Sequence, residues 1–237
     1  MSYPDAPSLT PQRPSPWKAL FRVITEPEAT FREFGGRVPI LPAYLTLMVI
    51  GLAVALIQMP LALQAAEETM LQSPAYTPEM ATLGKVSGMV TLFLAALAGP
   101  WIAGVITAGL SIFFGQFQEE RVTFGSYLGM VGYARMPLAV AQLLSGILVL
   151  VLGKQALNLN LSVAALAPEG TGLMLKTFLG TIGPFGIWYY IVLAIGFGAL
   201  HRGKASRGVG LVATLYIGGT LLMLGLTALG SKFVPQM

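Results

Sequence analysis

Long apolar stretches separated by short polar connections set the pattern of this chain. Five of them are nearly free of charge and cover residues 38–63, 86–115, 136–153, 178–200 and 209–230. An α-helix of about 20 residues crosses a hydrocarbon core of about 30 Å, and each stretch reaches or approaches that length. The pattern therefore predicts an all-α integral membrane protein, a bundle of five transmembrane helices.

Residues 17–37, ahead of the first predicted span, have the pattern of short amphipathic helices. Trp17, Leu20, Phe21 and Ile24 recur at i, i+3, i+4 and i+7, which is the spacing of one helix face. We expect this first helix to be interfacial, lying in the cytoplasmic headgroup region of the membrane.

A second short helix is expected immediately afterwards. Thr25 and Glu28 have the spacing of a capping box, in which each side chain bonds the backbone N–H of the other residue. Phe31 and Phe34 share a face, and Gly35-Gly36 is expected to end the helix. Two interpretations stay open: the two helices anchor the chain at the membrane surface, or they form a docking surface for a cytosolic partner.

The pattern divides the chain into four parts. Residues 1–16 are rich in proline and are expected to form a disordered tail. The amphipathic helices occupy residues 17–37, the transmembrane domain residues 38–230, and a short C-terminal tail residues 231–237. Composition supports this division, because 55% of the residues are hydrophobic and 10% are charged, against about 25% charged in a typical soluble domain.

Lys and Arg residues predict the orientation, because they are enriched in cytoplasmic loops. With five spans, the N-terminal region and the second and fourth connections share one side, which carries nine of these residues. They are Arg13, Lys18, Arg22, Arg32, Arg37, Arg121, Arg202, Lys204 and Arg207. The opposite side carries Lys85, Lys154, Lys176 and Lys232. We therefore expect a multi-pass protein of the inner (plasma) membrane, with a cytoplasmic N-terminus and the C-terminus on the opposite side.

Several chemistries need residues that the sequence does not offer. There is no cysteine and His201 is the one histidine, so a standard zinc site has too few ligands. His201 lies in a basic loop and is expected to be solvated. No Asp or Glu lies inside a predicted span, which disfavours proton- or sodium-coupled transport. We expect no enzymatic activity, no catalytic residue, no cofactor and no metal site, and no nucleic-acid partner.

Arg135 is the one charge that could lie inside the membrane. It follows a stretch beginning at Thr123 that has the pattern of an interfacial or re-entrant helix. In one interpretation Arg135 lies at the cytoplasmic boundary and snorkels to the headgroups. In the other it is functional and pairs with Glu119, with Glu120 or with a lipid phosphate.

Three short motifs occur in order along the chain. They are Pro27-Glu28-Ala29-Thr30-Phe31 ahead of the first span; Thr123-Phe124 followed by Gly132-Tyr133-Ala134 and Pro137; and Trp188 followed by Gly203-Lys204-Ala205-Ser206-Arg207. Together they resemble the Yip-domain family of membrane proteins, named for Ypt/Rab-interacting proteins. The first motif is similar to that of prokaryotic members.

The resemblance implies five helices, a cytoplasmic N-terminus and a C-terminus on the far side. Eukaryotic relatives act in vesicle traffic and bind Rab GTPases through their cytoplasmic portion. Here that portion is reduced to 37 residues, so the resemblance implies the kind of role rather than the partner. That role is a non-enzymatic membrane adaptor that binds other membrane proteins or lipid.

Two hypotheses of function remain. The first is an adaptor or accessory subunit of a membrane complex, whose partners are membrane lipids and another membrane protein or a second copy of the chain. Its expected contact residues are Trp17, Phe21, Phe31, Phe34, Tyr133, Arg135, Arg202 and Arg207. The alternative is a transport or lipid-translocating protein with a cavity between proline-kinked helices, lined by Gln58, Gln142 and Ser145.

Overall fold

The computed structural model describes residues 15–71, 77–153, 162–168 and 170–233, and within these ranges every regular element is a helix. The elements are α1 (Pro16–Thr25), α2 (Pro27–Glu33), α3 (Leu41–Leu71), α4 (Pro78–Gly115), α5 (Phe124–Ala134), α6 (Met136–Leu152), η1 (Val163–Leu166), α8 (Leu173–Gly180), α9 (Pro184–Leu200), η2 (Ala205–Gly208) and α10 (Val209–Phe233). The predicted all-α membrane class is confirmed. Residues 1–14 and 234–237, which hold most of the two predicted tails, lie outside the described residues.

The described helices include four that are long and apolar enough to span a membrane, or five if a bent pair is counted as one span. Three of the four are α3, α4 and α10 with η2, and the other is α5 continued by α6. The pair is α8 and α9, which meet at an angle of 48°. Side chains such as Leu94, Ile106 and Leu222 are exposed along the outside, as expected of surfaces that face lipid tails.

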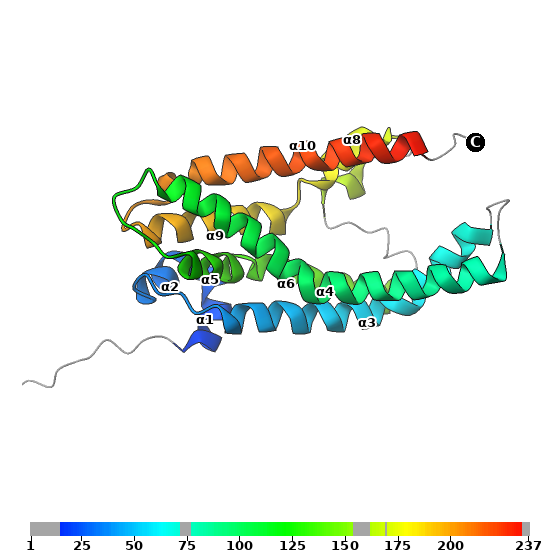
Figure 1. Ribbon diagram of the computed structural model, residues 1–237, viewed down its shortest axis with the longest axis horizontal. Helices are drawn as coiled ribbons and strands as arrows, with labels where there is room; N and C mark the ends of the chain where they lie inside the picture. Colours follow the sequence, from blue (N-terminus) through cyan, green and yellow to red (C-terminus); the bar gives the residue numbers. More distant parts are fainter. Residues whose placement is uncertain (1–14, 72–76, 154–161, 169, 234–237) are drawn as a thin grey trace, which may run out of the picture.

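The helices are not evenly distributed along the bundle (Figure 1). α3, α4 and α10 run along its long axis, whereas α1, α2, α5 and α9 gather where α3 begins. We call this end of the bundle the platform end. α10 runs away from it and finishes at the opposite end. The start of α1 and the end of α10 therefore lie at opposite ends of the molecule.

The best-packed region lies at the platform end, with α5 at its centre. Every residue of α5 from Ser126 to Ala134 is buried. Two glycines allow its neighbours to come close: a Cβ on Gly129 would lie 2.5 Å from the carbonyl oxygen of Val38, and one on Gly132 would lie 2.8 Å from the ring of Tyr44. The Tyr44 hydroxyl donates a hydrogen bond to the carbonyl of Leu128 at 3.2 Å. α5 therefore packs directly on the backbone and side chains that open α3.

The helix expected to begin near Thr123 and the third predicted span, residues 136–153, correspond to α5 and α6. α5 passes into α6 with Arg135 as the one non-helical residue between them, and residues 124–152 together qualify as a single candidate span. The motif Gly132-Tyr133-Ala134 therefore lies at the end of α5. Its glycine reduces intrinsic helix propensity, but close packing against α3 compensates for that loss.

The face of α1 that is buried in the structure differs from the apolar face that the sequence predicts. Leu20 is buried as expected, but Ala19 and Val23 are the other buried residues, and Trp17 and Phe21 are exposed. Because Ala19 and Val23 have small side chains, α1 lies close to the bundle on this face. Its two aromatic side chains, Trp17 and Phe21, point outward.

The predicted capping box does not form. α1 continues to Thr25, so the N-cap of α2 is Glu26, and its side chain makes no capping hydrogen bond. Thr25 instead donates its hydroxyl to the carbonyl of Arg22. The predicted end of α2 is confirmed, because Gly35 and Gly36 have φ of 59° and 83°, a conformation that glycine adopts without strain.

Substitution of Gly129 by alanine tests the central packing of α5. The added methyl group would collide with the backbone of Val38, which cannot move as a side-chain end can, so we expect a destabilisation of about 1–3 kcal/mol. Chemical or thermal unfolding in detergent measures it. Gly109→Ala is the matched control, since a Cβ there meets no atom within 4 Å. Equal stability of the two variants would contradict this account of the packing.

Candidate functional site

α1 and α2 form a surface unit at the platform end, which we call the N-terminal platform. The Tyr133 hydroxyl from α5 donates a hydrogen bond to the carbonyl of Pro16 at 2.9 Å. The Trp188 indole N–H from α9 donates to the carbonyl of Ile24 at 3.1 Å. Both ends of α1 are therefore held to the bundle by hydrogen bonds, one from the buried Tyr133 and one from Trp188, which is 36% exposed.

An ion-pair network joins the two helices of the platform. The Arg22 guanidinium contacts the carboxylate of Glu33 at 2.8 and 2.9 Å and that of Glu26 at 3.1 Å. The hydrogen bonds from Arg22 lower the pKa of Glu33, because they stabilise the ionised form of this carboxyl. All three side chains are well exposed to solvent, so the network orients α1 and α2 more than it stabilises them.

Two large aromatic side chains stand on the outer face of this fixed helix. Trp17 is 54% exposed and Phe21 is 77% exposed. They are four residues apart and therefore neighbours on the helix surface. A paired aromatic surface on a helix that is held in place is suited to contact another protein or the membrane interface.

A cavity of about 660 Å³ lies beside the platform, where three connections of the chain meet. Its walls come from the end of α2 and the segment before α3, from the connection between α4 and α5, and from the end of α9. Four arginines line it: Arg32, Arg37, Arg121 and Arg202. The three basic regions that were predicted to share one side of the membrane therefore do gather at one end of the molecule.

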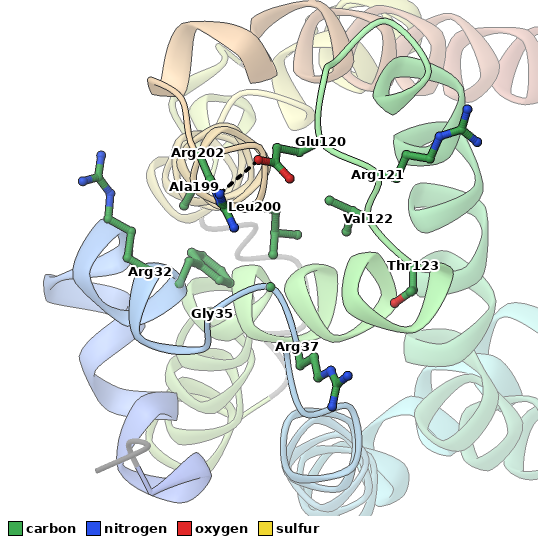
Figure 2. A pocket seen from close by; sticks show the side chains of 12 residues that line it. Arg32, Gly35, Arg37, Glu120, Arg121, Val122, Thr123, Ala199, Leu200 and Arg202 are labelled. Atoms are coloured by element: carbon green, nitrogen blue, oxygen red, sulfur yellow. Dashed lines mark ion pairs between the residues drawn. The ribbon is translucent and has the colours of Figure 1, made fainter. Parts of the chain in front are cut away.

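Figure 2 shows how the charged groups of this cavity are arranged. Arg202 and Glu120 point toward each other and form an ion pair, with a guanidinium nitrogen 3.3 Å from a carboxylate oxygen. Arg32, Arg37 and Arg121 extend outward from the surrounding rim. Arg202 lies in the left-handed region with φ of 49°, a backbone conformation that is strained for arginine.

The connection that carries Arg202 is held in place by bonds within the chain. The amide of Gly203 donates to the carbonyl of Gly198 at 2.8 Å. The Arg207 side chain donates to the carbonyl of His201 at 2.9 Å. Arg207, one of the predicted contact residues, thus has a defined role in the shape of this connection.

His201 is buried, contrary to the expectation of a solvated loop residue. It is 1% exposed, and its Nε2 lies 2.8 Å from the Tyr127 hydroxyl. Its ring also lies against the ring of Phe197. Burial lowers the pKa of His201 and outweighs the opposite effect of the backbone and carboxylate of Glu120. The sequence offers little sign of this contact, because Tyr127 lies 74 positions away.

Three of the predicted contact residues lie inside the protein. Phe31, Phe34 and Tyr133 are buried, and the rings of Phe34 and Tyr133 lie 5.1 Å apart. They support the platform from within, and Phe31 also lines the arginine cavity. Arg135 is half-buried at the junction of α5 and α6. Glu120, one of its expected partners, pairs with Arg202.

The polar groups expected to line a transport cavity are dispersed. The Gln58 amide donates to the Ser145 hydroxyl at 3.4 Å, which links α3 to α6. Gln142 is exposed on the outer surface. Two of the three groups therefore serve helix packing.

Comparison with known proteins identifies a family for this chain. A family model described as the Yip1 domain matches residues 21–229 of the chain. No curated protein and no solved structure matches the chain. The matched range includes the platform from Phe21 onward, all the candidate spans and the cavity.

Tyr133→Phe tests the attachment of α1. The variant keeps the ring but loses the bond to Pro16, so we expect a loss of about 1 kcal/mol in stability and faster tryptic cleavage after Lys18. Tyr127→Phe removes the other tyrosine hydroxyl of α5 and serves as control, with cleavage after Lys18 unchanged. Equal cleavage of the wild type and Tyr133→Phe would show that the bond does not hold α1.

The burial of His201 predicts a pH dependence of stability. Its pKa is lowered in the folded protein, so below the ordinary value of 6.5 the unfolded chain binds a proton that the folded state resists. Stability is therefore full above that pH and declines as the pH falls toward 5. Unfolding midpoints in detergent measure this decline. Because His201 is the one histidine, His201→Gln should remove the decline, and a decline of the same size in that variant would contradict the assignment.

Proposed function

The chain belongs to the Yip1 domain family, and from this premise we propose that it is a non-enzymatic adaptor or accessory subunit of a membrane complex. In this proposal the polytopic bundle holds the N-terminal platform at the membrane, and the platform binds a cytosolic segment of another membrane protein. Membrane lipids surround the spans.

The observation that carries the proposal is the rigid presentation of Trp17 and Phe21. Both side chains are exposed on a helix whose two ends are bonded to the bundle through Tyr133 and Trp188. Aromatic residues supply much of the affinity in protein interfaces. A helix that is already ordered loses little conformational entropy on binding, so more of the contact energy becomes affinity.

The distribution of charge supports a cytoplasmic platform end. Four arginines from three connections line one cavity there, and cytoplasmic segments of inner-membrane proteins are enriched in such residues. The proposal therefore places the N-terminus in the cytoplasm and the C-terminus on the opposite side. We do not extend it to transport, since Gln58 and Ser145 bond each other and Gln142 is exposed.

Site-specific cross-linking in the native membrane tests the proposal. A photo-reactive phenylalanine analogue at position 21 should give an adduct with one other membrane protein at a fixed stoichiometry. The matched control is position 117, because Phe117 is also exposed, at 72%, and lies in the connection between α4 and α5. Adducts with lipid alone would overturn the adaptor function in favour of surface anchoring, and adducts with a second copy would replace the proposed partner by self-association.

Reconstitution with the cross-linked partner gives a quantitative prediction. Phe21→Ala should weaken binding about 10- to 30-fold, the loss typical of a buried aromatic contact. Because Phe21 is largely exposed in the free protein, its replacement should leave the unfolding midpoint unchanged. Unchanged affinity in Phe21→Ala would remove the platform face from the interface.

A further inference from the structure

The arginine-lined cavity at the platform end is a separate feature from the aromatic face of α1. Its lining carries Arg32, Arg37, Arg121 and Arg202 against the single carboxylate of Glu120. These arginines come from segments far apart in the sequence, and folding brings them around one space (Figure 2). The cavity volume of about 660 Å³ lies within the range of about 300–1,000 Å³ typical of small-ligand sites.

The positive charge of this cavity is only partly balanced by the protein. Arg202 pairs with Glu120, and Arg32 pairs with Glu28. Within the described residues, Arg37 and Arg121 form no ion pair with a carboxylate. Arg37 and Arg121 extend outward from the rim of the cavity. When these flexible side chains turn inward, an anion in the cavity is attracted by more than one guanidinium group.

The shape of the cavity leaves room for such an anion. Gly35 and Gly36 form part of its wall, and a Cβ on either would meet no atom within 4 Å. Arg202 is held in a strained left-handed conformation by a connection with its own hydrogen bonds. This conformation ends α9, because the amides of Arg202 and Gly203 donate to the carbonyls of Ala199 and Gly198, the pair of bonds typical of a helix C-terminus. The backbone that carries the Arg202 side chain is therefore fixed in position.

Guanidinium chemistry selects the class of ligand. Arginine presents a planar fork of N–H donors that matches two oxygens of a phosphate group, and several arginines together favour a multiply charged one. The cavity also lies at the ends of the candidate spans, where lipid headgroups are located. Phosphate can therefore reach it from a lipid or from solution.

We propose that the cavity between α2, the α4–α5 connection and the end of α9 is a binding site for a phosphate group, carried by an anionic lipid or by a soluble ligand. On binding, Arg202 exchanges its contact with Glu120 for the phosphate, and Arg37 and Arg121 turn inward from the rim. The site is independent of the proposed adaptor interface, because it uses none of the exposed aromatic residues of α1.

The test uses the full-length protein in phosphate-free buffer and neutral detergent, with two probes. One is dioleoyl phosphatidic acid in mixed micelles, compared with dioleoyl phosphatidylcholine, and the other is inorganic pyrophosphate. Binding is measured by native mass spectrometry for the lipid and by calorimetric titration for pyrophosphate. Binding of phosphatidic acid alone identifies a headgroup site, and binding of both probes identifies a site open to soluble phosphates.

Charge-matched variants separate the cavity from general electrostatic attraction. Arg121→Gln with Arg202→Gln should weaken binding of the effective probe at least 10-fold. Lys18→Gln with Lys204→Gln removes the same charge at the same end, outside the cavity lining, and should change binding less than 3-fold. Equal losses in the two double variants, or no binding of either probe by the wild type, would overturn the proposal.

A third variant is expected to bind the probe more tightly, which is a result that misfolding would not produce. Glu120→Gln frees Arg202 from its ion pair and makes the cavity more positive, so binding of the same probe should strengthen about 3-fold or more. Weaker or unchanged binding in Glu120→Gln would contradict the proposed exchange of Glu120 for phosphate.

Discussion

The burial of α5 is the constraint on which the platform end depends. Gly129 lets this helix lie against the backbone at Val38, and the carbonyl of Leu128 accepts the hydroxyl of Tyr44. From the same helix, Tyr133 reaches α1 and Tyr127 reaches His201 after α9. One short helix thus fixes the positions of α1, α3 and the α9 connection relative to each other. The surface features of this end follow from contacts made in its interior.

The two surface features of the platform end use this fixed interior in different ways. The outer face of α1 presents Trp17 and Phe21, whose side chains are more than half exposed and are available to a partner. The cavity instead collects arginines on connections that α5 and α9 hold close together. Their side chains remain exposed, so water screens their mutual repulsion and keeps its cost small. A fixed backbone with exposed charged ends can bind an anion without rearrangement of the bundle.

Much of the fold could be predicted because span length and charge are local properties of the sequence. The five apolar stretches, the end of α2 at Gly35 and the gathering of basic regions needed no knowledge of tertiary contacts. The candidate site could not be predicted in the same way, because its geometry depends on tertiary contacts. The orientation of α1 is decided by bonds such as that from Tyr133 to Pro16, across 117 positions. The same reason applies to His201, whose burial depends on Tyr127, and to Arg202, whose partner Glu120 lies on another connection.

The central claim is that α1 is a fixed part of the folded bundle and presents its aromatic face from a rigid support. Hydrogen–deuterium exchange of the wild-type protein in lipid nanodiscs tests this claim most directly. The account predicts that the amides of α1 with bonds inside the helix exchange slowly, close to the rates of α5. Exchange of these α1 amides at the rate of an unstructured segment, with α5 still protected, would contradict it.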